Sequence, residues 1–308
     1  MLLATTLPNA TAFASLVVEL VLISAAAFAG GSSLAFLSLG HRPMQVLLSL
    51  TGGVLLGVGM LHLLPHAWMQ LDRDIEKTMG WVLAGFFLMF LLERAFHGHA
   101  HHTADGSCDH DHHDHHDHDG HAAPAPAGRS FAWCGAFAGL ALHSLADGAA
   151  LAASVGSDAA HGVGLLAGFA TFLAILLHKP FDSGIIATLM IDAGASPRTR
   201  LVVNALYAAV VPLGAFGFLT SLTLFGGRQD AVLGIAMAMA AGAFLCIAAA
   251  DLLPEVQFHS HDRVLLTTAL AMGLAIAWGI TALERSSHAH GAHVQRGAIP
   301  AGAPAHDR

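Results

Sequence analysis

Two short motifs place a histidine four residues before an aspartate inside apolar stretches of the chain. One motif holds His143 and Asp147, and the other holds His178 and Asp182. A spacing of four residues puts both side chains of a pair on one face of an α-helix. Two imidazoles and two carboxylates suit Zn²⁺ or another borderline first-row ion. The motifs therefore predict one divalent metal site built by two helices, with a structural hydrogen-bonding patch between the helices as the alternative.

The composition places these motifs in a membrane. Of the 308 residues, 55% are hydrophobic and only 11% are charged, and the mean hydropathy is +0.62. A soluble domain carries about 25% charged residues. Ionisable side chains are costly inside a bilayer, so a functional role is their default explanation. The Lys and Arg residues are scattered, which argues against a nucleic-acid partner, and three distant cysteines predict neither a disulfide framework nor a metal motif.

Eight apolar segments are long enough to cross the hydrocarbon core as helices. They cover residues 12–38, 44–68, 78–96, 131–155, 161–190, 200–224, 229–254 and 263–284. The predicted fold class is an all-α polytopic membrane protein. Its parts are 1–96 with three spans, 97–130 as a His/Asp-rich disordered loop, 131–190 with two spans and the metal site, 191–285 with three spans, and 286–308 as a flexible tail.

The two motifs are expected to meet near the middle of the membrane. Between the two motifs, the chain runs ~15 residues toward one membrane surface and ~15 residues back, at 1.5 Å per residue. It therefore returns to about the same depth in the membrane. Pro180 predicts a kink in the second of these helices, because it cannot donate to the carbonyl of Leu176.

Lys179 points roughly 100° away from His178 on a helix. A protonated lysine cannot ligate a metal, so Lys179 is expected to replace a second cation, pair with an aspartate or snorkel along the pathway.

A sequence repeat indicates inverted symmetry. His62-Leu-Leu-Pro-His66 near the end of the second span resembles Asp251-Leu-Leu-Pro-Glu255 near the end of the seventh, and a Leu-Glu-Arg run follows each at a similar distance. Because five spans precede the second copy, the copies must point in opposite directions. We therefore expect spans 1–3 and 6–8 to be inverted repeats around a central pair, spans 4 and 5, with substrate near the midplane. Chance recurrence of Leu-Leu-Pro is the alternative.

The repeat ends carry polar side chains that suit an ion pathway. His62 and His66 share a helical face at one mouth, and Asp251 and Glu255 share one at the other. Ordinary polar groups at the interface are the alternative.

The loop between spans 3 and 4 alternates His and Asp and predicts a weak, multi-site metal binder. Its densest histidines are His110, His112, His113, His115, His116 and His118.

Taken together, these motifs resemble the ZIP (Zrt/Irt-like) family of divalent metal transporters, in a branch with His-Lys on the fifth span. In family members with two adjacent metals, the resemblance implies ligands of the second ion at three positions of this chain. Those positions hold Ser144, Lys179 and Val211, the last in a Val-Pro-Leu-Gly run where the family has Glu-Pro-Leu-Gly. The resemblance therefore implies a single metal here, with the ammonium of Lys179 near the vacated position.

The resemblance also implies function and location. It predicts a non-enzymatic transporter that imports zinc by alternating access, with Cd²⁺, Mn²⁺ and Fe²⁺ as further cargoes, and a homodimer in a bacterial inner membrane. It places the termini outside and the His-rich loop in the cytoplasm. Arg residues in the loops favour the same orientation under the positive-inside rule, although the basic tail offsets the bias. An intramembrane metal-dependent hydrolase, a metal exporter and a metal-sensing module are the alternatives.

Overall fold

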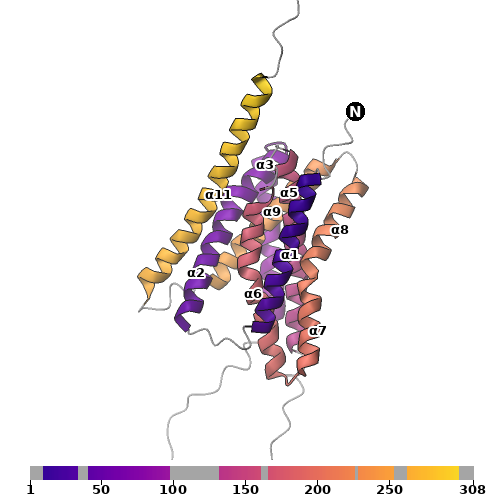
Figure 1. Cartoon of the computed structure of the whole chain (residues 1–308), viewed down its shortest axis with the longest axis vertical. Helices are drawn as coiled ribbons and strands as arrows, with labels where there is room; N and C mark the ends of the chain where they lie inside the picture. The colour runs from indigo at the N-terminus through magenta and orange to yellow at the C-terminus, as the bar shows by residue number, and fades with distance from the viewer. Residues whose placement is uncertain are drawn as a thin grey trace, which may run out of the picture.

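Helices account for nearly all of the part of the chain that the structure describes, residues 10–33, 41–97, 132–160, 166–225, 228–252 and 262–297 of a computed structural model (Figure 1). The first half contains α1 (Ala10–Ser33), α2 (His41–Val58), the π-helical turn η1 (Gly59–Leu63), α3 (Leu64–Gln70), α4 (Ile75–His97) and α5 (Ala132–Ala160). The second half contains α6 (Phe169–Asp192), α7 (Pro197–Ala208), α8 (Val210–Phe225), α9 (Gln229–Ile247), the π-helical turn η5 (Ala248–Leu252) and α11 (Arg263–Gly297).

Within these ranges, eight helical segments are long and apolar enough to cross a membrane, which confirms the predicted fold class. Three spans are composite, because α2, η1 and α3 run on from one another, as do α7 with α8 and α9 with η5. The largest difference from the predicted boundaries lies in α11, which continues to Gly297 instead of ending near residue 284. Helix α5 also continues beyond its predicted end near residue 155, to Ala160. Ser154, Ser157 and Asp158 are buried there and bonded to neighbouring helices, so tertiary contacts hold this polar turn in the helix.

The helix pairing has the inverted symmetry that the sequence predicts. Helix α2 packs along α11 as α9 packs along α4, and α1 packs along α6 as α8 packs along α5. Exchanging the first three spans with the last three, and α5 with α6, converts each pair into its counterpart. Both copies also contain a π-helical turn at the repeated motif, η1 with His62 and η5 with Asp251. Such turns are rare in proteins, and those that occur are often found at functional sites.

The strongest pairings divide the helices into two groups. The site group contains α1, α5, α6, α7 and α8, and the flanking group contains α2, α3, α4, α9 and α11. Figure 1 shows α2 and α11 of the flanking group at the left and α1, α7 and α8 of the site group at the right. Between the groups, α5 contacts α4 and α9, and α6 contacts α2, less extensively than the four strongest pairs, all of which lie within a group. The metal-site motifs lie on α5 and α6, at this boundary.

Glycines let α5 and α8 approach closely enough to fix the position of the first motif. A Cβ atom on Gly214 of α8 would overlap the backbone carbonyl of Leu145, in the middle of that motif. We expect Gly214→Ala to lower stability by about 1–3 kcal/mol, the usual effect of overpacking, and to lower the thermal unfolding temperature in detergent. Gly217→Ala on the same helix is the control, because no atom lies within 4 Å of its Cβ position. Equal unfolding temperatures for the two variants would contradict this account of the packing.

Candidate metal centre

The structure brings the four residues of the two motifs together. One ligand atom from each of His143, Asp147, His178 and Asp182 lies within 4.8 Å of the others. The Nε2 atoms of His143 and His178 lie 3.3 and 3.4 Å from Oδ2 of Asp147, and 3.8 and 3.9 Å from Oδ2 of Asp182. All four side chains lie between α5 and α6, as the spacing of four residues requires. Their ligation of a metal ion stays a prediction.

The orientation of His178 suits metal binding through Nε2. Its Nδ1 lies 2.8 Å from the carbonyl oxygen of Ala174, one turn earlier on α6. A carbonyl can only accept, so Nδ1 carries a proton. Nε2 lies 3.4 Å from Oδ2 of Asp147, also an acceptor, and becomes available as a ligand when it holds no proton. Ligating histidines are commonly held in one tautomer by such a bond on the other ring nitrogen. The backbone of α6 therefore prepares this imidazole as a ligand before any ion arrives.

Lys179 is fully buried and forms ion pairs with both aspartates. Its Nζ lies 2.5 Å from Oδ2 of Asp147 and 3.0 Å from Oδ2 of Asp182, the same oxygen atoms that the imidazoles face. Of the three roles expected for Lys179 from the sequence, the structure shows the pairing with aspartate. The ammonium lowers the cost of burying two carboxylates side by side. An ion entering the centre must compete with it for their charge.

Tyr207 on α7 is a further member of the centre that the sequence motifs do not reveal. Its hydroxyl donates to Oδ2 of Asp182 at 3.2 Å and accepts from the hydroxyl of Ser144 at 2.9 Å. The side chain is 1% exposed. Ser144 therefore binds Tyr207 in this structure, while Val211, on the next helix, is a buried apolar residue. The only signal in the sequence was that Tyr207 is the single tyrosine of the chain.

Replacement of Tyr207 tests whether this hydroxyl orients the centre. In Tyr207→Phe, the ring stays and the donor to Asp182 is lost. We expect metal affinity to fall about tenfold, at the low end of the 10–100-fold effect of removing a group that orients a ligand. Titration of the purified protein with Cd²⁺ measures this affinity. Ser144→Ala is the control, because it leaves the bond from Tyr207 to Asp182 in place, and an equal loss in both variants would contradict the assignment.

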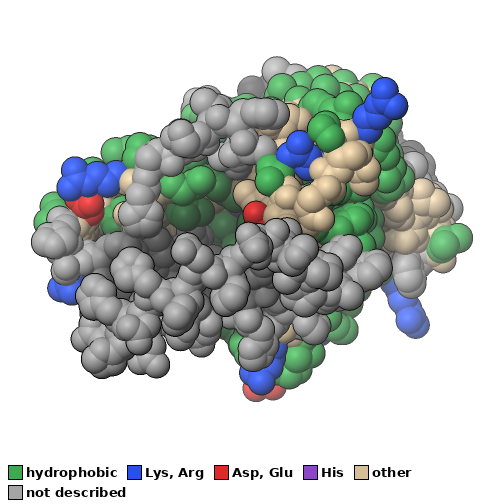
Figure 2. Space-filling view, turned by 90° about the horizontal axis from the view of Figure 1, so that it is seen from below, with side chains coloured by type: hydrophobic (Ala, Val, Ile, Leu, Met, Phe, Trp, Pro, Cys, Tyr) green, Lys and Arg blue, Asp and Glu red, His purple; other side chains and the backbone are tan. Residues whose placement is uncertain are grey.

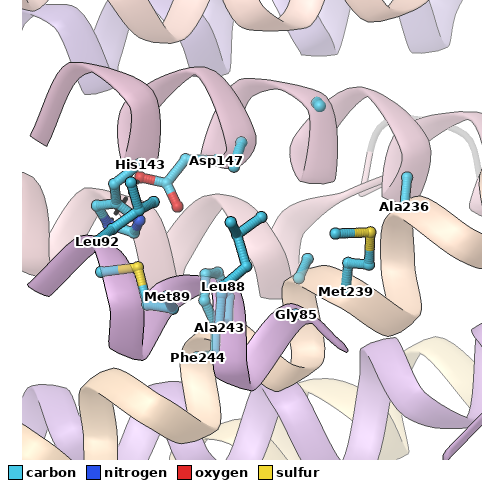
Figure 3. A pocket seen from close by; sticks show the side chains of 13 residues that line it. Gly85, Leu88, Met89, Leu92, His143, Asp147, Ala236, Met239, Ala243 and Phe244 are labelled. Carbon is cyan, nitrogen blue, oxygen red and sulfur yellow. Dashed lines mark ion pairs between the residues drawn. The ribbon is translucent and has the colours of Figure 1, made fainter. Parts of the chain in front are cut away.

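A cavity of about 220 Å³ lies beside the centre, between α4, α5 and α9. His143 and Asp147 form its polar end, and its other lining residues are apolar, as Figure 3 shows. They include Leu88 and Met89 of α4 and Phe244 of α9, and the ring of Phe244 lies edge-on to His178 at 6.2 Å between centroids. The centre therefore borders an open volume at the boundary between the site group and the flanking group.

Of the residues predicted for the two mouths, the two histidines belong to a group separate from this centre. His62 in η1 and His66 in α3 meet Asp158 near the end of α5. Asp251 lies in η5, but its side chain, Glu255 and the histidines of the loop between α4 and α5 are outside the described part of the structure. The sequence pattern missed Asp158, because the polar residues around it were assigned to a connection between helices.

Comparison with known proteins gives one consistent result. A model of the ZIP zinc transporter family matches residues 13–282. Zinc transporter ZIP1 of Mus musculus is 27% identical over 265 residues, covering 78% of this chain and 79% of the relative, and ZIP1 of Homo sapiens is 25% identical over 272 residues, with 79% and 80% covered. Zinc transporter ZIP9 of Micropogonias undulatus is 32% identical over 207 residues, covering 64% of this chain and 56% of the relative.

Proposed function

Because the chain belongs to the ZIP zinc transporter family, we propose that it imports Zn²⁺ into the cytoplasm by alternating access through a mononuclear His/Asp site. As a member of this family it is an integral membrane transporter with eight spans, and not an enzyme. The observation that carries the proposal is the convergence of two imidazoles and two carboxylates on the boundary between two helix groups. This donor set suits zinc in its charge and in its mixture of nitrogen and oxygen ligands.

The proposed cycle begins at the histidine mouth. An ion passes His62 and His66, loses water to the four central ligands, and leaves past Asp251 and Glu255. The centre opens first to one side of the membrane and then to the other. Between these two states, the site group moves past the flanking group and carries the centre with it. The division of the helices supports this movement, because the contacts between the groups are less extensive than those within them.

A single ion is proposed because a protein cation already sits on the carboxylates. The ammonium of Lys179 pairs with Asp147 and Asp182, and neither Ser144 nor Val211 supplies a carboxylate or imidazole for a second ion. A second dication beside the first would be repelled by this ammonium in a medium of low dielectric constant. Anomalous scattering that showed two adjacent ions at full occupancy would contradict the mononuclear site.

The proposed orientation places the starts of α2, α7 and α11 in the cytoplasm. Exposed arginines stand at these helix starts, among them Arg42, Arg198 and Arg263. Figure 2 shows this end of the molecule, with basic side chains at separated points of its rim and hydrophobic side chains between them. Under the positive-inside rule this distribution supports outside termini and a cytoplasmic His-rich loop. We further propose a bacterial inner-membrane location and a homodimer, on the resemblance to the family alone.

Metal flux into sealed vesicles of known orientation tests the function. We expect zinc to move toward the side that holds the His-rich loop, and Cd²⁺, Mn²⁺ and Fe²⁺ offered in turn to define the range of cargoes. Vesicles without protein give the background, and orientation is assigned by protease access to that loop. Flux only in the opposite direction would show an exporter, and metal binding without any flux would show a sensing module; either result would overturn the proposed import.

A further inference from the structure

A second group of buried ligands lies at the histidine mouth. His62, His66 and Asp158 each offer a ligand atom within 4.8 Å of the other two. Nε2 of His62 lies 3.9 Å from Oδ2 of Asp158, and Nε2 of His66 lies 3.8 Å from Oδ1 of the same carboxylate. His62 and Asp158 are each 1% exposed. The two imidazoles thus face the two oxygens of one carboxylate, at separations that an ion between them would fill.

Neighbouring polar groups contact these ligands. The hydroxyl of Ser157 lies 3.0 Å from Nδ1 of His66. The hydroxyl of Ser154 lies 3.0 Å from Nε2 of His62, so an ion that binds this nitrogen displaces that hydroxyl. The backbone N–H of Gly168 donates to Oδ2 of Asp158 at 2.8 Å. A proton on Nδ1 of His66 that is donated to Ser157 leaves Nε2 to face Asp158. Such secondary bonds orient metal ligands in known sites.

A buried acidic residue, Glu19, lies beside this group. Its side chain lies on α1, the residue is 6% exposed, and its Oε2 has no hydrogen-bond partner among the described residues. This oxygen lies 3.4 Å from the Cβ position of Gly168, the residue whose N–H binds Asp158. Gly168 has a φ of +81°, a conformation that favours glycine. Two carboxylates therefore flank one glycine, and a buried unpaired carboxylate oxygen is costly unless a cation or donor reaches it.

We propose that His62, His66 and Asp158 form a second binding site for a divalent first-row metal ion, separate from the central site, with the carboxyl group of Glu19 beside it. Its donor set is two imidazoles and one carboxylate. The ligands come from both helix groups, His62 and His66 from the flanking group and Asp158 from the site group. An ion bound here therefore links the two groups in the arrangement seen in the structure. Its role as an entry site rests on the proposed transport function, whereas its occupancy does not.

Anomalous scattering from crystals of the full chain grown with Cd²⁺ tests the occupancy. We expect one peak at the centre and a second between His62, His66 and Asp158. A peak at the centre with none at the second position, at saturating Cd²⁺, would overturn the proposal.

Matched variants test the ligands. Asp158→Asn removes a charge but keeps an oxygen that can accept from Gly168, so we expect the second peak to disappear and the central peak to stay. Thr171→Val is the control, because the Thr171 hydroxyl binds Ser154 at 3.0 Å without being a ligand, and both peaks should remain. A second peak that persists in both Asp158→Asn and His66→Ala would overturn the assignment of ligands.

Uptake measurements separate this proposal from the transport function. If the second site delivers ions to the centre, Asp158→Asn raises the KM for zinc uptake about tenfold and leaves the maximal rate near that of Thr171→Val. An unchanged KM would overturn the role as an entry site. A wild-type protein that shows both Cd²⁺ peaks and no flux would overturn the proposed transport function and would support the second site as a binding site.

Discussion

Replacing His178 or Asp182 by alanine is expected to abolish zinc uptake into sealed vesicles. Each variant removes one of the four side chains that we propose as ligands from a buried centre. Breaking such a buried set of charges typically costs about 3–5 kcal/mol, which corresponds to roughly 10²–10⁴-fold in affinity. Radioactive zinc uptake into proteoliposomes measures the loss. The geometry supports the effect because all four ligand atoms lie within 4.8 Å of one another.

The control for these variants lies on the same helix. Asp192 is an exposed carboxylate at the end of α6, so Asp192→Ala should transport zinc at the wild-type rate. Asp182→Asn adds a variant of nearly the same shape, which tests the charge without leaving a cavity. Undiminished uptake by a folded His178→Ala protein would remove the central site from the mechanism.

Replacing Lys179 by methionine is expected to tighten metal binding and weaken the metal-free protein. Methionine keeps much of the side-chain volume but leaves Asp147 and Asp182 buried without their cation, at a cost of about 3–5 kcal/mol. A bound dication relieves this cost, so affinity should rise by roughly 10²–10⁴-fold. Cd²⁺ titration and thermal unfolding with and without metal measure both effects. The unfolding temperature should fall without metal and recover when the ion binds.

Lys179→Arg is the matched control, because it keeps a positive charge at the same position. It should bind metal far more weakly than Lys179→Met. If Lys179→Met had the affinity and the metal-free stability of the wild-type protein, the ammonium would not be a competitor for the carboxylates. A slower maximal uptake rate in Lys179→Met is also expected, since a more tightly held ion leaves more slowly.

The sequence predicted the convergence of His143, Asp147, His178 and Asp182 because their signal is local, and their ligation of a metal stays a prediction. His143 with Asp147, and His178 with Asp182, each lie on one turn of a helix, and ionisable groups stand out in apolar segments. When a short connection joins two helices, residues equally far from the connection lie at the same depth in the membrane. The convergence of the two motifs therefore follows from the length of chain between them. The eight spans and the inverted repeat were predictable for the same reason, because apolar length and a duplicated motif are visible along one stretch of chain.

The remaining members of both clusters come from contacts that no local pattern encodes. Tyr207 reaches Asp182 from α7, and Glu19 reaches Gly168 from α1. Asp158 was assigned to a loop because a Ser-Val-Gly-Ser-Asp run has the composition of a turn. Its bond from Gly168 and the histidines of the second span keep that run helical and buried. Helix ends set by such tertiary contacts are not readable from composition.

The pairing of Lys179 with two aspartates has an electrical consequence for the cycle. With both aspartates ionised, Lys179 protonated and the histidines neutral, the empty centre carries a net charge of minus one, and a bound Zn²⁺ makes it plus one. A membrane potential acts on each charge that crosses it with about 2.3 kcal/mol per 100 mV. A negative interior therefore draws the loaded centre inward and drives the empty centre outward, so one voltage favours both halves of the cycle.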